Sequence, residues 1–210
     1  MTAVWMMLVL MTAARPTAQT LPVAIIAPLN VTDSLVRRIC VEADGIWQPA
    51  GVVFDCHRIQ SDQDANGWPL TVTIDDREAR LEPDKALGWI PFTNGAPERS
   101  IFLSQANAEE LIRLTPGLPN VTVLSHEILI GRALGRALAH EVGHYLLRSK
   151  VHTTHGLMRT GRAGDEFLAL SRDGFELSPE QWSAAARSLQ AIGLTAHVQD
   201  RKREPHVVDW

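Results

Sequence analysis

The sequence predicts an α+β domain, and three observations lead to this class. Short apolar or alternating segments, which are typical of β-strands, recur through the first half of the chain. A segment between two of them has its apolar residues at helical spacing. A much longer helix is expected from about Ser125 to Arg148. At 210 residues, with 45% apolar and 21% charged residues, the chain has the composition of one folded domain and not of a disordered protein.

The elements of the first half follow in a simple order. A buried strand over 21–29 leads into a helix that Thr32 or Asp33 can cap, and the apolar face of this helix runs from Leu35 to Trp47. Four more strands and a second helix precede the long helix. The expected strands cover 52–59, 70–74, 87–92 and 100–103, and the expected helix covers 106–114. Together the strands would form a mixed, twisted sheet of about four to five strands.

The chain after the long helix has a less regular pattern and contains several glycines. The residues 178–181 (SPEQ) are typical of a helix start, because serine caps the helix, proline suits its first turn and glutamine reaches back to the cap. We expect this last helix to end at Gly193. A single domain over 19–210 would then consist of an N-terminal subdomain, about 21–148, and a small C-terminal helical subdomain, 149–210.

The first residues form a separate segment. Val4–Leu10 is an apolar run that is too short to span a bilayer, which requires about 20 apolar residues. It is typical of the apolar core of a secretory signal, with small residues at Ala14 and Ala18 for cleavage. We therefore expect residues 1–18 to be a signal peptide, the protein to be secreted or periplasmic, and no stable membrane insertion after cleavage. An N-terminal core strand is the alternative.

Charge and cysteine content add two expectations. The formal net charge of −4 leaves no basic excess to neutralise phosphates, so we expect no nucleic-acid partner. Cys40 and Cys56 are the two cysteines of the sequence, and in an oxidising compartment they would form a disulfide. Two small buried thiols are the alternative.

His140-Glu141-Val142-Gly143-His144 is an H-E-x-x-H motif within the long helix. Successive helical residues turn by about 100°, so the two histidines are offset by about 40° and stack one turn apart, where they can bind one Zn²⁺. Glu141 lies to the side of that face, in position to take a proton from a water molecule that the ion activates. Solvated or core histidines with an incidental glutamate are the alternative.

The stretch HEVGHYLLRSKVHTTHGLM resembles the metzincin zinc peptidases, whose pattern is H-E-x-x-H-x-x-G-x-x-H followed by a turn that contains methionine. His140, Glu141 and His144 match this pattern. The sequence departs from it at Leu147, where the family has glycine, and at Lys150, where the family has its third histidine.

The resemblance implies a third ligand beyond the helix and a methionine beneath the metal. We expect His152, two residues after the family position, to be the third zinc ligand and Met158 to be the turn methionine, as in matrixin-type enzymes. His155 is the alternative third ligand, and a carboxylate from Asp165 or Glu166 would instead give a gluzincin-type site.

The resemblance also implies the fold and the reaction. In metzincins the sheet packs on the active-site helix, and its last strands include an antiparallel edge that binds extended peptides. We accordingly expect a secreted zinc metalloendopeptidase with Glu141 as general base and an extended peptide or protein substrate along an edge within 87–104. The departures at Leu147 and Lys150 leave open a zinc-containing binding module without turnover.

Small residues recur every four positions along the long helix, at Gly131, Gly135, Ala139 and Gly143. Glycine costs about 1 kcal/mol relative to alanine in a helix interior. The stripe therefore predicts that another backbone comes close to this side of the helix, and we expect that backbone to belong to the sheet.

Overall fold

The computed structural model describes residues 18–75, 86–118 and 122–203, with side chains through residue 193. The predicted signal peptide, apart from its last residue, lies outside the described residues.

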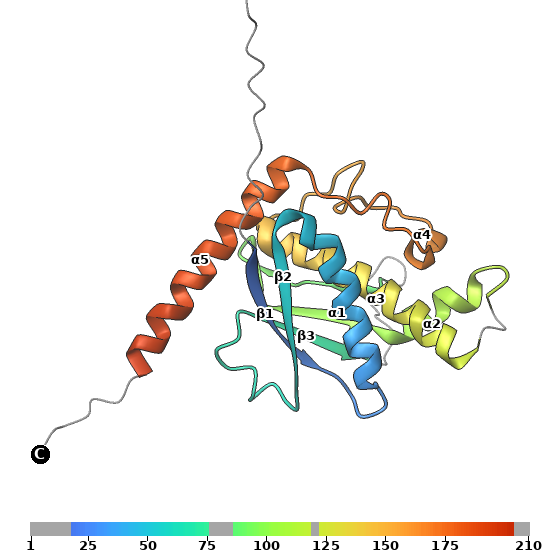
Figure 1. Cartoon of the computed structure of the whole chain (residues 1–210), viewed down its shortest axis with the longest axis horizontal. Coiled ribbons are helices and arrows are strands. Elements are labelled where there is room, and N and C mark those ends of the chain that lie inside the picture. Colours follow the sequence, from blue (N-terminus) through green and yellow to red (C-terminus); the bar gives the residue numbers. More distant parts are fainter. Residues whose placement is uncertain (1–17, 76–85, 119–121, 204–210) are drawn as a thin grey trace, which may run out of the picture.

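A five-stranded sheet forms the centre of the fold (Figure 1). Its strands lie in the order β2-β1-β3-β7-β4. Strand β4 runs antiparallel to β7, and the other neighbours are parallel, which confirms the mixed sheet with an antiparallel edge. The strands are β1 Gln19–Ile26, β2 Val52–Ile59, β3 Leu70–Asp75, β4 Gly88–Trp89 and β7 Ser100–Ser104, and a separate pair consists of β5 Phe92–Thr93 and β6 Ala96–Pro97.

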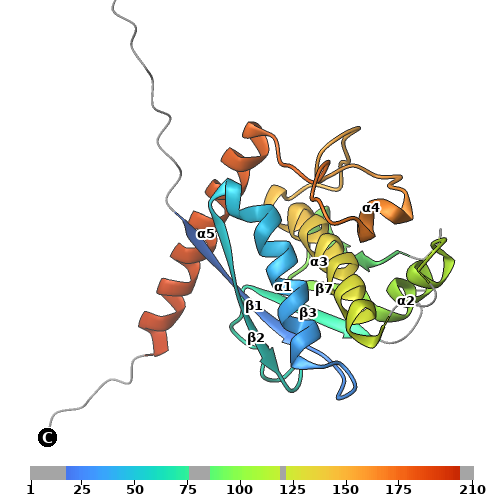
Figure 2. The same ribbon diagram turned by 45° about the vertical axis from the view of Figure 1, so that its right-hand side comes forward.

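Two helices pack side by side against the sheet, α1 and α3 (Figures 1 and 2). The helices are α1 Asp33–Trp47, α2 Gln105–Leu114, α3 Val123–Leu147, α4 Gly164–Leu168 and α5 Pro179–Arg203. Thr32 caps α1 by accepting a hydrogen bond from the Leu35 amide. At the other end the fully buried indole of Trp47 donates a hydrogen bond to the Ala139 carbonyl of α3 at 3.0 Å, so the two helices are held together at this point.

The strand expected over 87–92 is divided in the structure. Strand β4 is short, and the chain then leaves the main sheet to form the β5–β6 hairpin. Pro91 lies at the division, and proline has no N–H to donate to a strand ladder. Asn94 and Gly95 at the hairpin turn both have positive φ, which a tight two-residue turn requires.

Gly131 and Gly135 of the small-residue stripe face α1, and Gly143 faces Met158, so the prediction that the stripe meets the sheet is wrong. A Cβ atom at Gly131 would lie 2.6 Å from the Arg38 Cβ atom, and one at Gly135 would lie 2.7 Å from the Ile39 carbonyl oxygen. The two glycines therefore let the backbones of α1 and α3 approach closely. Residue spacing identified the close-packed side of the helix, but it carried no information about which element packs there.

The last helix begins as predicted and ends later than predicted. The Ser178 hydroxyl accepts a hydrogen bond from the Gln181 amide, and the Gln181 side chain accepts one from the Ser178 amide. Helix α5 then continues through Gly193 to Arg203. Beyond the helix's own nearby backbone, no atom of the described residues lies within 4 Å of the place where a Cβ at Gly193 would be. The subdomain boundary near residue 148 stays a prediction.

A disulfide joins Cys40 of α1 to Cys56 of β2, as predicted. A hydrogen bond from the Phe54 amide to the Asp44 carboxylate, 2.8 Å long, ties the same helix and strand together. None of the helices in the described ranges is long and apolar enough to cross a membrane.

Candidate metal centre

The candidate site lies on the C-terminal half of α3. Thr122 begins this helix by accepting a hydrogen bond from the Ser125 amide, and Arg148 ends it in a left-handed conformation with φ of 50°. Because the helix is continuous between these residues, His140 and His144 lie one turn apart on one face. The turn at Arg148 sends the chain back past that face.

His140 and His144 converge with His152, which comes from the loop after α3. The possible ligand atoms of the three residues all lie within 4.8 Å of one another. The ring centroids of His140 and His144 are 4.8 Å apart, and the ring of His152 lies 5.2 Å from the first and 4.8 Å from the second. The structure thus brings together the three histidines that the sequence analysis selected as metal ligands.

Backbone carbonyl groups orient two of these imidazoles. His140 Nδ1 lies 2.8 Å from the Leu157 carbonyl oxygen, and His144 Nδ1 lies 2.7 Å from that of Ser149. Because a carbonyl oxygen can only accept, each Nδ1–H donates, and the lone pair of the neutral ring is left on Nε2.

Burial favours the uncharged form of the histidines. It lowers the pKa of His140 to about 4, and it also lowers the pKa values of His144 and His152. Neutral imidazoles with a free nitrogen lone pair are the form that binds a metal ion. The donor set, the ring orientation and the protonation state therefore all suit a divalent ion with nitrogen ligands.

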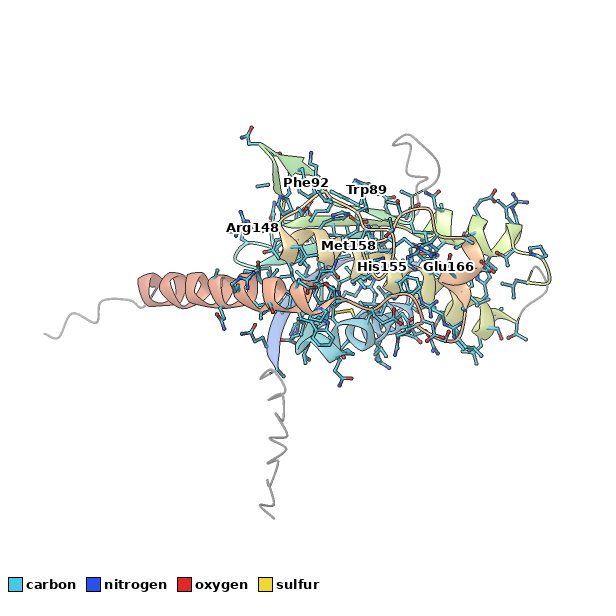
Figure 3. The ribbon with its side chains drawn as sticks, turned by 90° about the horizontal axis from the view of Figure 1, so that it is seen from above. Trp89, Phe92, Arg148, His155, Met158 and Glu166 are labelled. Atoms are coloured by element: carbon cyan, nitrogen blue, oxygen red, sulfur yellow. A yellow bond between two sulfur atoms is a disulfide. The ribbon has the colours of Figure 1, made fainter. Side chains whose placement is uncertain are left out.

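The alternative third ligands lie elsewhere. His155 is exposed, and its Nδ1 is 3.0 Å from the hydroxyl of the preceding threonine. Glu166 is in the first turn of α4 and forms ion pairs with Arg159 and Arg162 (Figure 3). Within the described ranges, neither His155 nor Asp165 or Glu166 belongs to the histidine cluster.

Glu141 is buried between α3 and the edge strand β4. It is only 8% exposed, and its carboxylate accepts a hydrogen bond from the Ile90 amide. A Cβ atom at Gly88 would lie 3.4 Å from Glu141 Cγ, so the backbone of β4 passes directly over this side chain. Burial raises the pKa of Glu141 to about 8, and the hydrogen bond from Ile90 opposes the increase.

Met158 fills the space beneath the loop that carries His152. It is 1% exposed, and its sulfur packs against Gly143 of α3 (Figure 3). Its carbonyl accepts a hydrogen bond from the Thr153 amide at 2.9 Å. Gly143 therefore makes room for the thioether.

A network of buried arginines holds the segment behind the site, and the sequence analysis missed it. Arg136 is fully buried, pairs with Glu42 at 2.9 Å, and donates to the carbonyl groups of Ala169 and Ser171. The signal available in the sequence was a charged residue within the apolar part of α3, one turn before His140.

Arg162 extends this network to the metal centre. Its side chain is 4% exposed, donates to the Gly156 and Gly174 carbonyls, and lies 3.8 Å from the centroid of the Phe175 ring. Gly156 directly precedes Leu157, whose carbonyl orients His140. Arg162 thus fixes the backbone that positions a candidate ligand.

A cavity of about 730 Å³ opens beside His140 and Glu141. Its remaining walls come from β4, from α2 and from the segment that includes α4, and many of them are apolar, such as Leu111 and Phe167. The cavity is large enough for a bulky side chain of a bound molecule.

The β5–β6 hairpin packs against another side of the cluster. Phe92 meets the His144 ring edge-on, with 6.2 Å between the ring centroids (Figure 3). Lys150, which stands where metzincins have their third histidine, has its ammonium group 4.9 Å from the centroid of the Phe92 ring. Lys150 therefore contacts the hairpin.

The sheet with its antiparallel edge, the long helix packed on it and the three-histidine cluster fit a zincin-like fold. No protein-family model and no curated protein matches the sequence. The structure is similar to the crystal structure of archaemetzincin from Methanopyrus kandleri, with a TM-score of 0.51 and 13% sequence identity. The similarity covers 83% of this chain and 98% of the archaemetzincin chain. At this identity the likeness shows a shared fold, and it agrees with the metzincin-like fold that the motif predicts.

Proposed function

We propose that the protein is a zinc-dependent peptidase that hydrolyses peptide bonds in extended substrates. One observation carries the proposal: three imidazoles gather beside a buried glutamate, and the backbone of the edge strand β4 lies over that glutamate. The similarity of the fold to that of archaemetzincin supports it.

His140, His144 and His152 would hold the zinc ion. A catalytic zinc site takes three protein ligands and keeps a further position open, and a set of three histidines meets this requirement. The carbonyls of Leu157 and Ser149 support two of the rings, as outer-shell partners do in metal sites. When bound, zinc supplies Lewis-acid chemistry, which lowers the pKa of a water ligand and polarises a carbonyl group.

Glu141 would act as the general base. A cation on the three histidines would favour the charged carboxylate against the effect of burial, and the carboxylate would then take a proton from the attacking water and pass it to the leaving amine, a role that contributes roughly 100- to 10,000-fold to the rate. The Ile90 amide and the close backbone of β4 hold the carboxyl group in place for both transfers. Met158 would serve as the apolar support beneath the metal centre, in the position of a Met-turn.

Strand β4 would bind the substrate. It is the last strand of the sheet among the described strands, and an edge strand can pair with an extended peptide through backbone hydrogen bonds. A peptide on this edge would pass close to Glu141, because Gly88 lies over that side chain. The cavity beside His140 would take an apolar side chain next to the cleaved bond.

Export of the protein is part of the proposal. The apolar run at the N-terminus is typical of a secretory signal, and the disulfide suits an oxidising compartment. A secreted or periplasmic location gives an extracellular or periplasmic protein as substrate. N-terminal sequencing of the mature protein tests this part by locating the cleavage site.

Metal analysis combined with a peptide-library cleavage assay tests the proposed function. We expect one zinc per chain, cleavage that a chelator abolishes, and recovery on adding zinc. The Glu141→Gln variant should keep its zinc and lose at least about 100-fold in activity, because only the base is removed. Cleavage by this variant at the wild-type rate would refute the mechanism, and full zinc content without cleavage of any peptide would favour a binding module.

Two single variants test the third ligand. His152→Ala should lower the zinc content of the purified protein, whereas His155→Ala should keep it, because only the first side chain reaches the other two histidines. The reverse result would assign the site to His155, and loss of zinc in neither variant would point to a carboxylate ligand.

A further inference from the structure

A second cavity, of about 590 Å³, lies past the C-terminal end of α3. Its walls come from the β2–β3 connection, the β6–β7 connection, the last turn of α3 and one face of α5. Figure 3 shows Arg148 at this end of α3, near α5 and the hairpin strands. The proposed peptidase mechanism makes no use of this cavity.

Three arginines from three separate elements line the cavity: Arg99, Arg148 and Arg187. All three are exposed, and no acidic residue is among the lining residues. None of the three forms an ion pair within the described part of the chain. Arginines elsewhere on the surface do pair with carboxylates, for example Arg58 with Asp33 at 2.7 Å.

This arrangement is electrostatically unfavourable without a partner. The whole chain carries a formal charge of −4, yet three arginines without an ion-pair partner among the described residues line one cavity. Like charges at such a site repel one another, and they attract anions. Tyr145 lines the same cavity; burial raises its pKa, and the charges of Arg99 and Arg148 oppose the increase.

The other polar groups of the cavity already have partners. The Tyr145 hydroxyl donates to the Pro69 carbonyl at 2.7 Å, and the Ser188 hydroxyl donates to the Leu146 carbonyl at 2.6 Å. Among the described residues, the guanidinium groups therefore remain as the side-chain donors of the cavity that have no partner, and a guanidinium matches a carboxylate with two parallel hydrogen bonds. The remaining walls include apolar side chains such as Ile192.

We propose that this cavity is a binding site for a carboxylate carried by an apolar organic group. The three arginines would bind the carboxylate, and the apolar walls would bind the group attached to it. The site is independent of the histidine cluster, so it can be tested whether or not the protein proves to be a peptidase.

Calorimetric titration of the full-length protein tests the proposal with two matched pairs of probes. N-acetyl-leucine is compared with N-acetyl-leucinamide, and a capped peptide with one internal glutamate is compared with its glutamine counterpart. We expect a carboxylate probe to bind at least about tenfold more tightly than its neutral partner and to lose affinity as salt is added. Preference for the first pair identifies a free acid as the ligand, preference for the second identifies an acidic side chain, and equal binding within both pairs refutes the proposal.

Single substitutions locate the binding site. Arg99→Gln, Arg148→Gln and Arg187→Gln should each weaken carboxylate binding about tenfold or more. Arg37→Gln is the matched control, because Arg37 is exposed, lies on α1 and does not line the cavity. Equal loss in the control variant would place the binding elsewhere. Thermal unfolding adds a readout that separates binding from structure: the three variants should unfold at or above the wild-type temperature, because each removes one of several mutually repelling charges.

Discussion

Replacing Gly135 by alanine tests the closest contact between the two central helices. Alanine is favoured over glycine by about 1 kcal/mol in a helix interior, so helix propensity alone predicts a more stable protein. In the structure, however, the added Cβ would lie 2.5 Å from Glu42 Cβ and 2.7 Å from the Ile39 carbonyl oxygen. The second neighbour is backbone, so α1 itself has to move.

The expected net effect is destabilisation by about 2 kcal/mol. Overpacking of this kind typically costs about 1 to 3 kcal/mol, and the gain in propensity offsets only part of it. Movement of Glu42 would also disturb its ion pairs with Arg136 and Arg172, both 2.9 Å long. At about 2 to 4 °C per kcal/mol for a domain of this size, the melting temperature should fall by about 4 to 8 °C.

Gly193→Ala is the matched control for this experiment. Gly193 also lies within a helix, α5, but beyond the nearby helix backbone no atom of the described residues lies within 4 Å of the added Cβ. This variant should gain up to about 1 kcal/mol from propensity alone. Both variants are compared by chemical and thermal unfolding. If Gly135→Ala were as stable as Gly193→Ala, the close approach of α1 and α3 would be refuted.

Three further predictions concern the supports of the fold. Arg162→Met should lower the free energy of unfolding by denaturant by about 3 kcal/mol, because it leaves buried carbonyls unpaired. It should also weaken zinc binding, since Arg162 holds the backbone next to the carbonyl that orients His140. Unchanged zinc affinity would argue against the link between Arg162 and His140. Glu127→Gln should cost about 0.5 to 1 kcal/mol at neutral pH. Hydrogen bonds from Ser34 and then Arg38 lower the pKa of Glu127. The stability that Glu127 contributes is therefore present above the usual glutamate pKa and is lost as the pH falls through the lowered value. Unfolding of the wild type and the variant across this acidic range should show that their difference in stability vanishes. Replacing both bridged cysteines by alanine should cost about 3 kcal/mol, as expected for a cross-link between residues 16 apart, and reductant should then change the stability of the wild type only.

Local patterns account for much of the site. The stacking of His140 and His144 follows from a spacing of four residues in a helix, and the cap at Ser178 follows from a four-residue motif. These features depend on neighbours within one or two turns, so their residue types are sufficient to predict them. The pairing of Cys40 with Cys56 was also predictable, because the chain offers no other cysteine.

The division of the strand expected over 87–92 shows where local patterns fall short. Its apolar residues suit one strand, but Pro91 and the Asn94–Gly95 turn direct the chain into a separate hairpin. The hairpin then packs Phe92 against His144, a contact across about fifty residues of sequence. Residue spacing within the segment 87–92 does not predict a contact with His144.

The sequence by itself determined most of the elements, the pair of histidines on one helical face and the glutamate beside them, because all of these arise from short-range geometry. Only the tertiary structure decided that His152 and not His155 joins the pair, that Gly131 and Gly135 of α3 face α1, and that Arg136 and Arg162 hold the loop behind the site. The physical reason is that each of these contacts joins segments from different elements. Their partners are selected by how the elements pack together, and no periodicity within a single segment encodes that packing.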